Sequence, residues 1–97
     1  MRGGGQTAAV LEELAECVPS SESVEEAYDR RSFLAAIERF LRTLPRETRV
    51  MFVRRYWYLE SGRAIAEAMQ MRESRVRVTL MRTRRKLKAF LEKEDVL

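Results

Sequence analysis

Glu73-Ser-Arg-Val-Arg-Val-Thr-Leu-Met-Arg-Thr-Arg-Arg-Lys-Leu-Lys88 is the stretch that decides the fold expected of this chain. On a helical wheel, at about 100° per residue, one side of it and of the residues that follow carries the apolar stripe typical of a helix packed on a core. The residues of this stripe are Val76, Leu80, Thr83, Leu87, Phe90 and Leu91. The spacing therefore predicts a helix that is anchored to a partner surface through one face.

The opposite face of the same helix is densely cationic. It carries Ser74, Arg75, Arg77, Val78, Met81, Arg82, Arg85 and Lys88, and no acid occurs between Ser74 and Lys88. The major groove of DNA admits an α-helix and is lined by phosphates, and apolar side chains such as Val78 and Met81 can contact thymine methyl groups. This stretch alone leaves two readings open: a helix that enters the major groove, or a basic surface helix with two exposed apolar residues.

Composition limits the class of protein. A chain of 97 residues forms one small domain, with or without a tail. It has no histidine and a single cysteine, Cys17, so we expect no intrachain disulfide, no metal site and no cofactor. Most nucleophile and general-base arrangements need a histidine, which argues against an enzyme. Nothing resembles a signal peptide or a membrane span, and the expected location is a reducing cytoplasm.

The positive charge is concentrated in one block of the sequence. Residues 46–88 contain 13 Lys and Arg against 4 Asp and Glu, whereas residues 1–45 contain 5 against 8. The last nine residues carry one lysine and three acids, which gives the net charge of +4. A basic block beside a mildly acidic one predicts a polyanionic partner for the block alone.

The first half of the chain predicts one clear helix. The glycine run in 2–6 has no periodic pattern, and 7–17 has helical spacing but is short and is followed by Pro19. Ser23-Val-Glu-Glu26 has the form of a capping box, and apolar residues then recur at helical steps up to Pro45. We expect residues 1–22 to be a linker or flexible segment, 23–93 a domain, and 94–97 a tail.

The second half predicts two further helices before the basic one. Pro45 suits a first turn, and Arg46 to Leu59 carries a broad apolar surface. Ser61 is the expected N-cap of a short helix over Gly62 to Met69, which a tight turn joins to the basic helix. A short helix, a turn and a basic helix make a helix-turn-helix, so the expected fold is an all-α bundle that ends in this motif without a wing.

Four segments follow one another in a specific order: Leu44-Pro-Arg-Glu-Thr-Arg49, Arg55-Tyr-Trp-Tyr-Leu-Glu-Ser61, Ala64-Ile-Ala-Glu-Ala68, and Arg75 to Lys88. Their order and spacing resemble region 4 of the sigma-70 family, specifically of the extracytoplasmic-function (ECF) type of sigma factor. The resemblance covers about residues 24 to 93. Region 2 of such factors has no counterpart in this sequence, so the resemblance implies a C-terminal fragment of a sigma factor or a free-standing relative.

The resemblance implies roles for individual residues. Arg77, Val78, Met81 and Arg82 match positions that read the -35 promoter element, and Arg55, Ser61 and Gly62 match positions that clamp the DNA backbone. In the family, a hydrophobic groove holds the flap tip of the RNA polymerase β subunit, and anti-sigma proteins often cover the same surfaces. The matching residues here are Phe33, Ile37, Phe40, Leu41, Val50, Phe52 and Val53.

Some positions depart from the family pattern. Gln70 stands where the turn usually has glycine, which adopts a left-handed conformation with least strain. Arg72 stands where serine or threonine is usual, so the recognition helix lacks a capping side chain, a loss of roughly 1 kcal/mol. Gly62 replaces a larger residue and Arg63 replaces a frequent acid. These departures weaken any inference about the promoter sequence.

Several features have a structural reading beside the functional one. Tyr56, Trp57 and Tyr58 at helical spacing indicate core and rim more than a base-stacking platform. Arg84 lies at the edge of the apolar stripe, which favours packing or an ion pair with Glu60 or Glu67 over DNA contact. Two other functions also remain open: a stand-alone helix-turn-helix regulator that dimerises on a symmetric site, and a sigma-like interaction module.

Overall fold

A computed structural model describes the backbone of residues 2–17 and 30–94. In these two ranges the chain forms only helices: α1 (Arg2–Ala15), α3 (Arg30–Arg42), α4 (Arg46–Tyr56), α5 (Gly62–Met69) and α6 (Glu73–Glu94). The all-α prediction is therefore confirmed. The predicted capping box at Ser23 to Glu26 lies outside the described residues, and the domain boundary predicted there stays a prediction.

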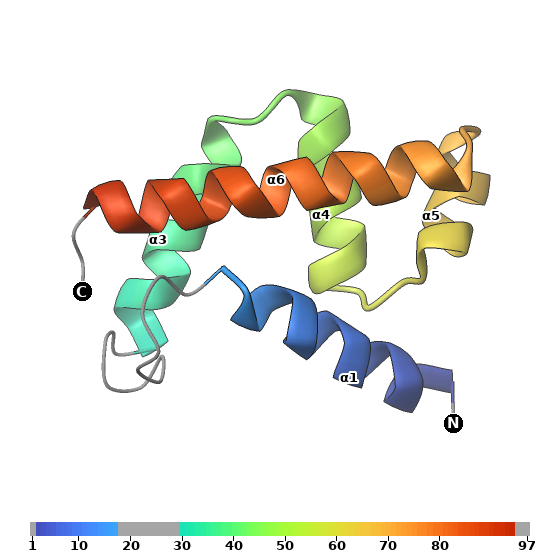
Figure 1. Cartoon of the computed structure of the whole chain (residues 1–97), viewed down its shortest axis with the longest axis horizontal. Helices are drawn as coiled ribbons and strands as arrows, with labels where there is room; N and C mark the ends of the chain where they lie inside the picture. Colours follow the sequence, from blue (N-terminus) through green and yellow to red (C-terminus); the bar gives the residue numbers. More distant parts are fainter. Residues whose placement is uncertain (1, 18–29, 95–97) are drawn as a thin grey trace.

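Helix α6 is the longest described helix and crosses α3, α4 and α5 (Figure 1). Its predicted stripe faces these helices: Val76, Leu80, Thr83, Leu87 and Leu91 are buried, and Phe90 is half-buried. Burial of one such aliphatic side chain stabilises the fold by about 1.5–3 kcal/mol. The hydroxyl of Thr83 is satisfied within the helix, because it donates to the carbonyl of Thr79 at 2.7 Å. The periodicity predicted from the sequence is confirmed.

Aromatic rings join α3, α4 and α6 in the core. The ring of Phe40 lies 6.2 Å from that of Phe52 and 5.5 Å from that of Phe90, and Phe52 lies 4.6 Å from Tyr56. Tilted and edge-to-face pairs at these separations contribute about 0.5–1.5 kcal/mol each beyond the area they bury. Tyr56 is buried, whereas Trp57 and Tyr58 are exposed, so these three residues form core and rim.

Helix α5 and the turn after it have the local structure expected of a helix-turn-helix. The Ser61 hydroxyl accepts a hydrogen bond from the backbone N–H of Ala64 at 3.0 Å, which confirms Ser61 as the N-cap. At the other end Gln70 adopts the left-handed conformation, with φ 56° and ψ 51°. The next amide, of Met71, then donates back to the carbonyl of Ala66 at 3.0 Å, which closes the helix and aims the chain into α6.

Helix α1 differs from the prediction for the first residues. The sequence predicts a linker without regular structure for the glycine run in 2–6, but α1 begins at Arg2. Farther along the helix Val10 is buried, as is Cys17 just beyond its end, and α1 lies beside α4 and α6 (Figure 1). Helical stability in proteins comes mainly from such packing rather than from propensity. A glycine run can therefore continue a helix whose later turns are docked.

Candidate nucleic-acid interface

The face of α6 opposite the buried stripe is exposed. Arg77, Arg82, Arg85 and Lys88 are exposed there, and Val78 retains 36% of its accessible surface. Among the described residues, no carboxylate lies within ion-pair distance of Arg77, Arg82 or Arg85. Unpaired guanidinium groups on one helix face are suited to phosphates and to the bidentate recognition of guanine. This exposed face is the candidate interface.

The first turn of α6 extends this face toward α4. Ser74 is exposed, and the Arg75 guanidinium pairs with Glu47 of α4, at 3.0 Å between Nη2 and Oε1. Both side chains are more than half exposed, and surface pairs of this kind contribute at most about 1 kcal/mol. Arg75 can therefore exchange its carboxylate partner for a phosphate at little cost.

The start of α5 lies next to the first turn of α6. A Cβ added to Gly62 would lie 3.9 Å from the side chain of Glu73, which is an ordinary contact. Packing therefore does not require a glycine at this position. Ser61 and Gly62 are each partly exposed. Their predicted role as backbone clamps stays a prediction.

Arg55 is placed differently from the sequence prediction, which made it a DNA-backbone contact. Only 7% of its surface is exposed. Its Nε and Nη2 donate to the two carboxylate oxygens of Glu13 at 3.2 and 2.9 Å, and its Nη1 donates to the carbonyl of Glu60 at 2.8 Å. In this structure Arg55 therefore holds α1 and the loop between α4 and α5, and it does not face solvent.

Arg84 also bonds within the protein, but to partners other than the predicted Glu60 or Glu67. Its Nη1 donates to the Tyr56 hydroxyl at 2.8 Å and lies 3.5 Å from Glu13. Glu60 pairs instead with Arg54, and Glu67 with Arg63. Burial alone would lower the pKa of Arg84, but the hydrogen bond with Tyr56 and the nearby acids raise it.

The comparison with family models agrees with this geometry. The model described as sigma-70, region 4 matches residues 34–87, which include α4, α5, the turn after it, and most of α3 and α6. The chain belongs to the sigma-70 region 4 family. In sigma factors, region 4 binds the -35 promoter element. No curated protein and no solved structure gave a significant match.

Two further properties of the described residues concern metal ions and membrane spans. No group of three or more acidic, histidine or cysteine side chains is arranged to hold a metal ion there. None of the helices described is both long enough and apolar enough to span a lipid bilayer.

The C-terminal half of the region 4 interface is bordered by α1. Met81, Arg84, Arg85 and Lys88 of α6 line a hollow of about 370 Å³ together with Glu16 and Cys17. Met81 is half-buried, unlike Val78 one turn earlier on the same face. Three of the predicted DNA-contact residues on this half, Met81, Arg85 and Lys88, therefore lie beside the acidic side chain of Glu16.

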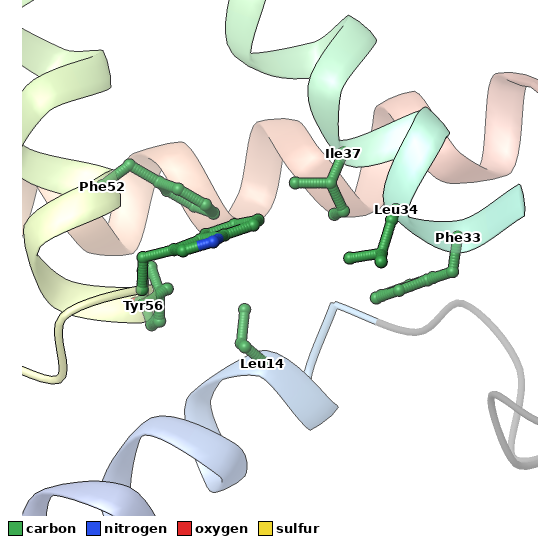
Figure 2. A pocket seen from close by; sticks show the side chains of 7 residues that line it. Leu14, Phe33, Leu34, Ile37, Phe52 and Tyr56 are labelled. Atoms are coloured by element: carbon green, nitrogen blue, oxygen red, sulfur yellow. The ribbon is translucent and has the colours of Figure 1, made fainter. Parts of the chain in front are cut away.

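The residues predicted to hold the polymerase flap divide into core and surface. Ile37, Phe40 and Phe52 are all buried. Phe40 is enclosed by the rings of Phe52 and Phe90, so the prediction that it contributes to a contact surface is wrong. Ile37 and Phe52 form the inner wall of an apolar hollow of about 400 Å³. Figure 2 shows this hollow, with Phe33 and Leu34 of α3 on one side, Phe52 and Tyr56 of α4 on the other, and Leu14 of α1 pointing into it. Trp57 also lines it.

The remaining predicted polymerase contacts are at the surface. Leu41 is half-buried, and Val50 and Val53 of α4 line a second hollow with Arg49, Arg54, Tyr58 and Glu60. Val50 and Tyr58 are among the exposed large apolar residues. This second hollow is apolar with a basic edge, and it is open to a partner protein.

Sequence reasoning missed Glu13, which is the centre of the contacts between α1 and the rest of the domain. Its Oε1 accepts from the Tyr56 hydroxyl at 2.8 Å as well as from Arg55. A signal was present in the sequence, because Glu13 falls in line with Val10, Leu14 and Cys17 at helical spacing. An acid within an apolar stripe indicates a buried basic partner.

Proposed function

We propose that this chain recognises the -35 element of bacterial promoters as the C-terminal domain of an ECF-type sigma factor. The observation that carries the proposal is the exposed cationic face of α6, opposite its buried stripe and directly after the α5 turn. This arrangement lets the core hold α6 rigidly while one face enters the major groove. The chain then acts by binding, in the cytoplasm where transcription takes place, without a catalytic step or a cofactor.

The side chains of the face divide into two roles. Arg85 and Lys88, with Ser74 and Arg75 at the other end, contact phosphates and fix the position of the helix. Arg77, Val78, Met81 and Arg82 approach the base edges, and Ser61 and Gly62 bring the start of α5 to the backbone. One good base contact discriminates by about 1–3 kcal/mol, so an isolated domain of this size binds weakly and depends on RNA polymerase for occupancy.

RNA polymerase is the proposed protein partner. The apolar hollow between α1, α3 and α4 and the hollow beside Val50 and Val53 offer surfaces for the β flap tip. Phe33, Leu41, Val50 and Val53 provide contacts that are at least partly exposed, while Ile37 and Phe52 support them from below. An anti-sigma protein that occupied these surfaces would exclude polymerase.

Selection of binding sites from random duplex DNA tests the proposal, with and without the isolated β flap. We expect one short asymmetric motif, enriched more strongly when the flap is present. A two-fold symmetric motif would instead establish a dimeric regulator. Flap binding without any DNA motif would establish an interaction module. Either of the last two results would refute promoter recognition by this chain.

Arg82→Ala then tests the assigned reader. We expect weaker binding to the selected duplex and relaxed preference at one base position, a change of about 1–3 kcal/mol. Arg42→Ala is the matched control, because Arg42 is an exposed arginine on α3, outside the α5–α6 unit. Equal losses on the selected and a scrambled duplex would remove Arg82 as a base reader and leave it as a phosphate contact.

A further inference from the structure

Helix α1 is joined to α4 and α6 mainly through the carboxylate of Glu13, and Glu16 just beyond α1 lies 3.9 Å from Arg84 Nε. Glu13 accepts hydrogen bonds from Arg55 and Tyr56, and Arg84 reaches its Oε1 at 3.5 Å. Val10 and Cys17, one turn to either side, are each only 2% exposed. The Cys17 thiol also lies 3.6 Å from the Arg84 carbonyl of α6. These contacts form a compact docking site between α1, α4 and α6.

The contacts of Glu13 are those that a DNA phosphate would make. Carboxylates and phosphates are both recognised by pairs of parallel N–H donors from arginine. Glu13 takes such a pair from Arg55. Glu16 adds a second negative charge beside Met81 and Arg85. Docked α1 thus places acidic groups where a polyanion would approach.

We propose that α1 is an intramolecular cover of the DNA-binding surface, held by Glu13 on Arg55 and Arg84, and that promoter DNA displaces it. Displacement frees both arginines for phosphates and opens the C-terminal half of the α6 face. The proposal rests on the DNA-binding function proposed above. Because only the undocked state binds fully, a cover that is open in about a tenth of molecules weakens the apparent affinity about tenfold.

A charge-neutral pair of variants on α1 separates the cover from simple electrostatics. Val10→Ser places a hydroxyl in the buried contact and favours release, whereas Leu11→Ser changes a side chain that is 62% exposed on the same helix. We expect Val10→Ser to tighten binding to the selected duplex several-fold, up to about tenfold, and Leu11→Ser to leave it unchanged. If Val10→Ser does not fold, a second pair of variants makes the same test. Glu13→Gln weakens the contact with Arg55 and Tyr56, and Glu12→Gln at an exposed position is its control.

Cys17 reports on the docking directly, because it is the only cysteine of the chain and is buried against α6. Burial also raises the pKa of its thiol to about 11, which further slows its reaction while α1 is docked. Iodoacetamide is a suitable probe, since it is neutral and is not repelled by DNA. We expect faster alkylation in Val10→Ser, and in the wild-type chain once the selected duplex is added.

Two results would overturn the cover while leaving the proposed function intact. The first is that the wild-type chain binds DNA fully while its Cys17 alkylates no faster in the complex than in the free protein. The second is faster alkylation in Val10→Ser without any gain in DNA affinity, which would make α1 a structural element only. Failure of every variant to bind the selected duplex would instead refute the proposed function, and the cover with it.

Discussion

Replacement of Gln70 by glycine should stabilise the domain. Gln70 ends α5 in the left-handed conformation, with φ 56° and ψ 51°, and it is an exposed residue. A side chain in this conformation costs about 1–2 kcal/mol, because Cβ approaches the following carbonyl oxygen. Glycine avoids that contact but loses about 0.4–1 kcal/mol through the larger entropy of its unfolded chain. The net expectation is a gain of about 0.5–1 kcal/mol in the free energy of unfolding.

Thermal unfolding followed by circular dichroism measures this gain. For a domain of this size, 1 kcal/mol corresponds to a shift in Tm of about 4–8 °C, so Gln70→Gly should melt a few degrees higher. Ala68→Gly is the matched control, since it introduces glycine two residues earlier at an exposed position inside α5. There the same residue should lower stability by about 1 kcal/mol.

The opposite signs of the two glycine variants make the reasoning refutable. If Gln70→Gly melts at or below the wild-type temperature while Ala68→Gly is destabilised as expected, left-handed strain is not what Gln70 contributes to this turn. The affinity for DNA of a stabilised Gln70→Gly chain should stay unchanged, because the substitution preserves the backbone path from α5 into α6.

Two further predictions concern the start of α6 and the α1 contact. Arg72→Ser should raise stability by about 1 kcal/mol in thermal unfolding, because Arg72 directly precedes α6 and a serine hydroxyl there can accept a hydrogen bond from a first-turn amide, which an arginine side chain cannot. Arg72→Ala, which also removes the charge, should not reproduce the gain. Burial by itself raises the pKa of Glu13, but hydrogen bonds from Arg55 and Tyr56 and the charges of Arg55 and Arg84 hold it below the ordinary value of 4.5. The stabilising contribution of ionised Glu13 is therefore complete above about pH 4.5, and it is lost as the pH falls through the lower pKa of the folded state. Over this acidic range Glu13→Gln should lose Tm less steeply than the wild-type chain. Parallel Tm-against-pH curves for the two chains would refute the assignment of Glu13 as the group responsible.

The part of the fold set by local sequence signals could be predicted. The stripe from Val76 to Leu91 repeats at helical spacing over several turns, and its burial follows from that repeat alone. Ser61 acts on an amide three residues away, so its capping role is also local. The expectation that Gln70 occupies a position suited to glycine is confirmed by its positive φ.

Contacts between segments far apart in the sequence could not be predicted from helical periodicity or local capping signals. Arg55 and Glu13 are 42 residues apart, and nothing local to Arg55 distinguishes it from Arg54 or from an exposed arginine of α6. The helical state of the glycine run in 2–6 likewise depends on docking farther along α1, which propensity does not include. The sequence also places Phe40 on a contact surface, because its enclosure depends on Phe52 and Phe90 from two other helices, which helical periodicity alone does not show.

Charge counts therefore overstate the DNA-binding surface of this domain when they are taken from sequence alone. The basic block of residues 46–88 contains 13 Lys and Arg, but Arg55 and Arg84 have their donors directed at protein acceptors. Only side chains that meet phosphates release counterions, and that release sets both the affinity and its dependence on salt. Under the proposed function, the exposed arginines of α6 would make the initial encounter with DNA. Under the proposed cover, Glu13 of α1 would control whether Arg55 and Arg84 can join them.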